Sequence, residues 1–172
     1  VQFHQSYSYE DFIQGYRPSE DKHFTLKNGV FYNFCETARA NPGQNHVFII
    51  DEINRGNLSK IFGELMMLIE RDKRSPDYAV PLTYSAAPFY VPDNVHLLGL
   101  MNTADRSLAM VDYALRRRFK FFSLQPEFGQ SFTDFLASEG VDSATINKLV
   151  QKIGDLNKAI GKSRDLGDGF RV

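Results

Sequence analysis

The sequence has no tryptophan, one cysteine and almost no net charge, and these absences exclude several classes of protein. With Cys35 alone, neither an internal disulfide framework nor a cysteine-rich metal site can form. The formal net charge of -1 gives no overall electrostatic reason to bind nucleic acid or an anionic membrane. No apolar run approaches the roughly 18 residues of a membrane span, and no signal peptide is visible. We therefore expect a cytoplasmic protein without a membrane segment.

A phosphate-binding loop of the form G-x-x-x-x-G-K-[ST] is also missing from the sequence. Gly161-Lys162-Ser163 matches only the end of this motif, because Leu156 stands where its first glycine is required. The tripeptide also follows a predicted helix, whereas a phosphate-binding loop follows a strand and opens a helix. The sequence therefore contains no backbone cradle for the phosphates of a nucleotide.

What is present is the composition and pattern of a folded α/β protein. Hydrophobic residues make up 42% of the chain and charged residues 24%. Val47–Ile50 and Val95–Leu100 are short apolar runs typical of buried parallel strands, and Leu58–Arg71 between them is predicted to be one helix. Because strands alternate with helices, the pattern indicates an α/β sheet with crossover connections.

Other segments carry weaker signals. Further strands are predicted at Val1–His4 and Phe119–Leu124, and a short helix is predicted to begin after Ser8. Two hairpins are predicted, one pairing Phe24–Leu26 with Val30–Tyr32 and one pairing Val80–Tyr84 with Phe89–Val91. The remaining predicted helices, one of which competes with the first hairpin, are Val30–Ala40, Ser107–Arg118, Thr133–Ser138 and Thr145–Ile160.

Two adjacent carboxylates, Asp51 and Glu52, follow the strand Val47–Ile50 directly. A buried, unpaired carboxylate is costly, and Mg²⁺ is a natural partner because it prefers oxygen ligands and retains several waters. The second carboxylate could polarise an attacking water. The alternative is a strand end capped by solvated acids. Asn54 and Arg55 favour the catalytic interpretation, because an amide and a guanidinium suit the orientation of water and phosphate.

Asn102 and three consecutive arginines supply further candidates. Asn102 follows the strand Val95–Leu100, where its amide could orient a water or contact a γ-phosphate; the alternative is an Asx turn. Arg116, Arg117 and Arg118 could include an arginine finger, which neutralises charge on a transferring phosphoryl group. The alternative is a helix C-terminus stabilised by cations. Because function in α/β sheets lies at the carboxyl ends of the strands, these residues are candidates for one site.

Long motifs in the sequence resemble a known family. VFIIDEINRGNLSKIFGELMMLIE and LMNTADRSLAMVDYALRRRF are similar to the AAA+ motor domain of the McrB family, the GTPase subunits of McrBC modification-dependent restriction systems. The opening VQFHQSYSYEDFIQGYRP and the closing GDGFRV are similar as well. The resemblance implies a P-loop NTPase-like three-layer αβα sandwich with a mainly parallel sheet. It also implies a partial nucleotide-binding core at residues 1–125 and the start of a helical lid at residues 126–172.

The resemblance also implies a role for each matching residue. Asp51 would be the Walker B acid that holds Mg²⁺, and Glu52 the catalytic glutamate that positions the attacking water. Asn102 would be the sensor-1 residue, and Arg117 the finger that acts on a neighbouring subunit's nucleotide, with Arg118 assisting. The remaining family matches near the nucleotide or the subunit interface are Asn54, Asp105, Arg106 and Arg116.

The partners expected of such a protein follow from the same resemblance. The first is further copies of the chain, arranged in a ring that is usually a hexamer. The second is GTP or ATP together with Mg²⁺. The third is an McrC-type nuclease subunit. DNA would be recognised by a separate N-terminal domain. The family's first strand and P-loop precede the residue that matches Val1, so we expect an internal piece of the motor that binds nucleotide weakly or not at all. Two other functions remain open: an ATP-driven protein-remodelling factor, and a non-catalytic assembly module.

Overall fold

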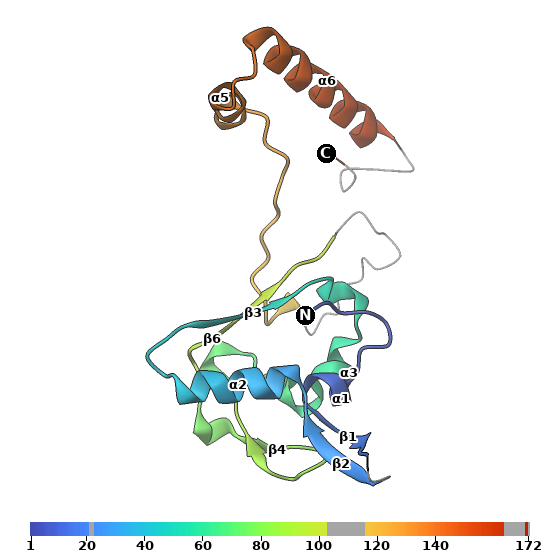
Figure 1. The fold of residues 1–172 in the computed structure, drawn as a ribbon, viewed down its shortest axis with the longest axis vertical. Helices are drawn as coiled ribbons and strands as arrows, with labels where there is room; N and C mark the ends of the chain where they lie inside the picture. Colours follow the sequence, from blue (N-terminus) through green and yellow to red (C-terminus); the bar gives the residue numbers. More distant parts are fainter. Residues whose placement is uncertain (21–22, 103–115, 164–170, 172) are drawn as a thin grey trace. The chain divides into compact units, whose positions relative to one another are not determined.

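The computed structural model describes residues 1–20, 23–102, 116–163 and 171 (Figure 1). The chain forms two compact units. The first comprises Val1–Met101 and Leu108–Lys120, and the second comprises Asn102–Ser107 and Phe121–Val172. Among the described residues, no helix combines the length and the apolar character that crossing a membrane requires.

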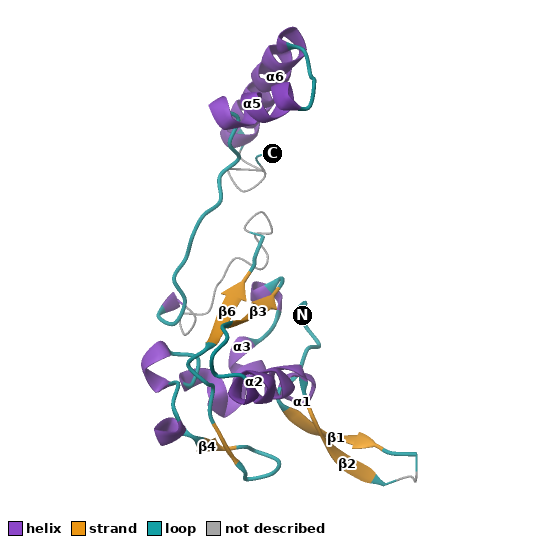
Figure 2. Ribbon diagram, turned by 60° about the vertical axis from the view of Figure 1, so that its left-hand side comes forward, coloured by secondary structure: helices purple, strands orange, loops and turns teal. Residues whose placement is uncertain are grey.

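A pair of parallel strands organises the first unit (Figure 2). Strand β3 (His46–Ile50) is hydrogen-bonded to β6 (Val95–Gly99), with Ile50 opposite Gly99. The two strands lie far apart in the sequence, so a crossover connects them and the predicted α/β class is confirmed. The predicted strand at Val1–His4 is reduced to an isolated parallel bridge between Gln2 and Asp51.

Helices cover one face of this strand pair. The covering helices are α1 (Tyr9–Phe12), α2 (Val30–Ala40) and α3 (Leu58–Phe62). Phe48 of β3 packs against Phe31 and Phe34 of α2, with ring centroids 5.2 and 4.9 Å apart. On the other face, Val47 and Ile49 are 54% and 47% exposed. The expectation of a fully buried strand was therefore wrong for β3, because alternate side chains point to opposite faces of a strand and only one face is covered.

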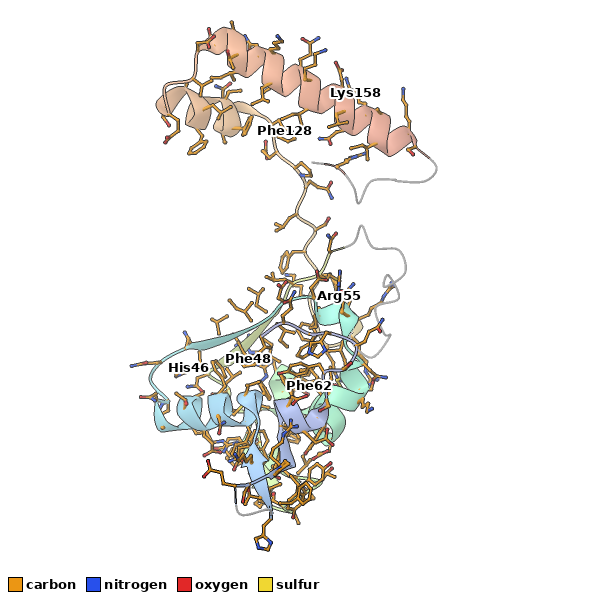
Figure 3. All side chains as sticks on the ribbon, turned by 45° about the vertical axis from the view of Figure 1, so that its right-hand side comes forward. His46, Phe48, Arg55, Phe62, Phe128 and Lys158 are labelled. Atoms are coloured by element: carbon orange, nitrogen blue, oxygen red, sulfur yellow. The ribbon has the colours of Figure 1, made fainter. Side chains whose placement is uncertain are left out.

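Phe12 lies at the centre of the aromatic core on the covered face. Its ring stacks on Phe31 at 4.8 Å between centroids and meets Phe62 edge-on at the same distance. Phe48 and Phe62, labelled in Figure 3, both contact Phe12. Cys35 of α2 is buried nearby, and this burial raises the pKa of its thiol to about 12. Phe12, Phe31, Phe48 and Phe62 therefore form one packed cluster that joins α1, α2, α3 and β3.

The predicted helix Leu58–Arg71 is interrupted, and the prediction of one continuous helix was wrong. Helix α3 ends at Phe62, and 3₁₀ turns follow at Gly63–Met67 and Arg71–Lys73. Gly63 has a φ of +52°, and a Cβ there would lie 3.1 Å from the ring of Tyr9. The close approach of Tyr9 thus favours a glycine, which leaves the helical conformation easily. Six apolar residues of this segment are predicted to form a buried face; Ile61, Phe62, Leu65, Leu68 and Ile69 are buried, whereas Met66 is only partly buried.

Two antiparallel hairpins complete the first unit. Strand β1 (Gln14–Pro18) pairs with β2 (Phe24–Asn28). The predicted pairing of Phe24–Leu26 with Val30–Tyr32 was wrong, because Val30 begins α2 instead. The second hairpin is confirmed, although shorter than predicted, as β4 (Val80–Pro81) and β5 (Pro88–Phe89), preceded by a 3₁₀ turn at Pro76–Tyr78.

The described part of the second unit contains two helices, both predicted from the sequence. Helix α5 covers Gln130–Ser138 and α6 covers Ser143–Lys162. Asp142 caps α6, where its Oδ1 accepts a hydrogen bond of 3.0 Å from the backbone N–H of Thr145. The predicted strand Phe119–Leu124 was wrong: none of these residues lies in a strand, and Phe122 and Leu124 are 77% and 92% exposed. An apolar run becomes a strand only where a neighbouring strand accepts its hydrogen bonds.

We expect Phe12→Ala to lower the free energy of unfolding by about 3–5 kcal/mol, because it removes the ring at the centre of the aromatic core. The measurement is urea unfolding followed by circular dichroism. Phe24→Ala is the matched control, because Phe24 is 69% exposed and its loss should change the free energy by less than about 0.5 kcal/mol. Equal losses for the two variants would show that Phe12 is not central to the core.

Candidate functional site

Asp51 and Glu52 lie where β3 ends, held by the backbone on both sides. The N–H of Asp51 donates to the carbonyl of Val1 at 2.8 Å, and the N–H of Phe3 donates to the carbonyl of Asp51 at 2.9 Å. On the other side, the N–H of Leu100 donates to the carbonyl of Ile50 at 2.8 Å. The acid pair therefore follows a strand that has neighbours on both sides at its carboxyl end.

Glu52 adopts a left-handed backbone conformation, with φ +52° and ψ +42°. Its N–H donates to Oδ1 of Asp51 at 3.0 Å, and the next N–H, of Ile53, donates to the carbonyl of Leu100 at 3.0 Å. Such a conformation is uncommon outside glycine and persists where the surroundings impose it. Here these hydrogen bonds fix the chain before and after Glu52, so the direction of its Cα–Cβ bond is set by the turn.

Two glycines allow this turn to pack closely. Ile53 begins the 3₁₀ turn Ile53–Arg55 and is buried. A Cβ at Gly99 would lie 2.7 Å from Cδ1 of Ile53, and a Cβ at Gly56 would lie 2.6 Å from Cδ1 of Ile61. Larger residues at either glycine would displace the turn, so both glycines help to place the acid pair.

Arg55 pairs with Glu52, and sequence reasoning did not identify this contact. Nε of Arg55, a residue labelled in Figure 3, lies 3.1 Å from Oε2 of Glu52. The Arg55 side chain is 45% exposed, and that of Glu52 is 20% exposed. The separation of three residues was the available signal, since side chains so spaced meet on a helical turn. From the sequence, Arg55 was expected only to help orient water and phosphate.

Asp51 is exposed, so the argument that its carboxylate needs a partner because of burial was wrong. The bridge to Gln2 continues the backbone pairing of β3 one residue past Ile50. Among the described residues, no group of three or more His, Cys, Asp or Glu side chains could hold a metal ion by itself. An exposed carboxylate fits Mg²⁺, which commonly uses one or two carboxylates and completes its shell with water and phosphate.

The two asparagines beside the acid pair have different surroundings. Asn57 caps α3, where its Oδ1 accepts a hydrogen bond of 3.0 Å from the N–H of Lys60. Oδ1 of Asn54 is buried, and it has no hydrogen-bond partner within the part of the chain that the structure describes. Because a buried acceptor without a partner is unfavourable, Asn54 fits a role toward a group that binds here.

The other residues predicted from the sequence differ in exposure, and two of them lie outside the described part of the chain. Arg116 and Arg117 are exposed, whereas Arg118 is only 7% exposed in its side chain, with Nε 2.9 Å from Oε1 of Glu70. Asn102 is exposed and belongs to the second unit. Asp105 and Arg106 lie outside the described residues.

Two further residues make side-chain hydrogen bonds to backbone carbonyls near the amino ends of β3 and β6. Nδ2 of Asn94, which is buried, lies within 3.1 Å of the carbonyl oxygens of Ala38, Asn41 and Gln44. Arg74 donates to the carbonyls of Ile69 and Val95, and burial lowers the pKa of its guanidinium. Sequence reasoning missed both residues, because their partners are backbone atoms distant in the sequence.

Comparisons with known proteins identify the family and two relatives of the chain. Residues 1–119 match the family model of the AAA domain, dynein-related subfamily. The chain is 56% identical, over its whole length, to a type IV methyl-directed restriction enzyme subunit, EcoKMcrB, of Escherichia coli strain K12. It is 30% identical, over 71% of its length, to a type II restriction enzyme component, BsuMI YdiS, of Bacillus subtilis strain 168.

The chain spans 38% of the length of each of these two relatives. The matched family segment contains β3, β6 and the turn with Asp51 and Glu52. Parallel strands with acids at the carboxyl end of one of them are the arrangement expected of a nucleotide-hydrolysing α/β fold. Since the family model covers most of the chain, the protein belongs to the AAA family, in its dynein-related subfamily.

Proposed function

We propose that this chain is the water-activating part of a GTP-hydrolysing AAA+ motor in a restriction enzyme of the McrB type. The observation that carries the proposal is the turn at Asp51 and Glu52, where two carboxylates follow a parallel strand and the backbone direction of the second is fixed. The 56% identity to a methyl-directed restriction subunit supports the restriction context.

In this proposal each of four side chains, three of them on the turn, has one task. Asp51 would hold Mg²⁺ through water, and the bound ion would neutralise charge on the nucleotide phosphates. Glu52 accepts a proton from the attacking water and aligns it with the γ-phosphate. Asn102 acts as the sensor that contacts the γ-phosphate, and Asn54 orients the water or the phosphate with its amide.

The arginines act between subunits in this proposal. Arg117 is the finger that reaches a neighbouring subunit's nucleotide, which its exposure supports. Arg118 assists by holding the end of the arginine segment through its ion pair with Glu70. Arg116, Asp105 and Arg106 contribute to the same interface. The assembly is a ring, with six copies as the proposed number, and an McrC-type subunit supplies nuclease activity.

The nucleotide used by the full-length protein separates the two enzymatic functions considered. A restriction motor of this type is expected to hydrolyse GTP faster than ATP, whereas a protein-remodelling factor would prefer ATP. DNA recognition is assigned to a different part of the full-length protein, because the formal net charge of -1 gives this segment no overall attraction for the phosphate backbone.

Glu52→Gln in the full-length protein should reduce the turnover number for GTP by roughly 100-fold or more, because the amide cannot accept the proton of the attacking water. The measurement is phosphate release under saturating GTP and Mg²⁺. Glu36→Gln is the matched control, because Glu36 also pairs with an arginine three residues away, on α2. Undiminished turnover of Glu52→Gln would remove Glu52 from the mechanism.

Arg117→Ala should reduce turnover by roughly 1,000-fold, the effect typical of losing an arginine finger. Mixing Arg117→Ala with Glu52→Gln subunits should restore part of the activity, because some interfaces then combine an intact Glu52 with an intact Arg117. Arg71→Ala, at an exposed arginine of the same unit, is the control. Full turnover by Arg117→Ala alone, or no recovery in the mixture, would contradict action between subunits.

The 172-residue chain alone should show no saturable binding of GTP or ATP in calorimetry at micromolar concentrations with Mg²⁺, because its sequence has no phosphate-binding loop. The full-length protein is the positive control under the same conditions. Tight, Mg²⁺-dependent binding by the chain alone would show that these residues grip the phosphates without that motif.

A further inference from the structure

The ion pair between Arg55 and Glu52 joins a guanidinium to the side chain proposed to activate water. Nε of Arg55 approaches Oε2 of Glu52 at 3.1 Å. Among the described residues, Oε1 of Glu52 accepts no hydrogen bond. One oxygen of the carboxylate is therefore held by a cation while the other remains available to a water.

The backbone makes this pairing a property of the turn. The N–H of Arg55 donates to the carbonyl of Glu52 at 2.8 Å, closing the 3₁₀ turn Ile53–Arg55. Ile53, between the two residues, is buried and hydrogen-bonded to Leu100, the residue after the end of β6. Glu52 and Arg55 are thus placed on the same side of a turn that is anchored to the strand pair.

A contribution to folding is a poor explanation for this pair. The Arg55 side chain is 45% exposed, and ion pairs at such positions add little to the stability of a protein. Such a pair can still restrict a carboxylate to one rotamer, and catalysis depends strongly on the position of reacting groups. The geometry therefore fits orientation of Glu52 better than stabilisation of the fold.

We propose that Arg55 is a positioning residue for nucleotide hydrolysis: its guanidinium holds Oε2 of Glu52, so that Oε1 faces the attacking water. The inference rests on the proposed function, because it requires Glu52 to act on that water. Arg55 acts through Glu52 and does not bind the nucleotide. Its loss should therefore lower the turnover number and leave nucleotide affinity unchanged.

The test uses the full-length protein with Arg55→Ala, Arg55→Lys and Arg17→Ala. Arg55→Ala should lower the turnover number for GTP by roughly 10- to 100-fold, the effect of misplacing a reacting group. Arg55→Lys should retain more activity, because its ammonium can still pair with the carboxylate. Arg17→Ala is the matched control and should keep full turnover, because Arg17 also forms an exposed ion pair, with Asp11 in the N-terminal region.

Two further measurements separate positioning from other roles. Calorimetry with a non-hydrolysable GTP analogue and Mg²⁺ should give the same dissociation constant for Arg55→Ala as for the parent, within about twofold. The urea midpoint should also be unchanged, as expected for an exposed pair. A dissociation constant that rises in step with the loss of turnover would assign Arg55 to nucleotide binding, and a lowered midpoint that accounts for the loss would assign it to folding.

The turnover numbers of Glu52→Gln and Arg55→Ala together separate the positioning role of Arg55 from the proposed function. If Glu52→Gln keeps its turnover, the proposed function fails and the role of Arg55 fails with it. If Glu52→Gln loses turnover while Arg55→Ala keeps or raises it, the proposed function stands and only the positioning role is overturned. Equal losses for Arg55→Ala and Arg55→Lys, with unchanged affinity and midpoint, would also overturn it, because the charge would then have no effect.

Discussion

The parallel pairing of β3 with β6 is the interaction on which the candidate site depends. With Ile50 opposite Gly99, the backbone of Leu100 bonds to both Ile50 and Ile53, and the turn carrying Asp51 and Glu52 has a fixed origin. A register shift of one residue would exchange the two faces of each strand and remove the aromatic core from beneath the site. The position of the two carboxylates is therefore tied to the packing of the whole first unit.

That register is held from two sides by different kinds of contact. Phe48 and the aromatic cluster around Phe12 select which face of β3 is covered. At the amino ends of the strands, the N–H of His46 in β3 donates to the carbonyl of Asn94, and Arg74 donates to the carbonyl of Val95 in β6. Apolar packing determines the face and directional hydrogen bonds determine the register, so the two contributions are complementary.

Much of this arrangement could be predicted from local patterns. The apolar runs at Val47–Ile50 and Val95–Leu100 became β3 and β6, and helices α2, α5 and α6 follow the predicted segments. The errors occurred where a distant neighbour decided the outcome. Tyr9 lies against Gly63, where the continuous helix was expected, and none of the residues Phe119–Leu124 lies in a strand. Periodicity identifies a segment that can form an element, but only its neighbours complete it.

The sequence by itself determined the α/β class, the two adjacent acids after an apolar strand and the absence of a phosphate-binding loop within it, because these features are local in the chain. The tertiary structure decided the exposure and the neighbours of the two acids. It exposed Asp51, placed Glu52 in a left-handed turn beside Arg55, and paired Arg118 with Glu70. These properties depend on hydrogen bonds and ion pairs whose partners are brought together only by the folded backbone. Composition and spacing do not determine which of several possible partners a side chain contacts.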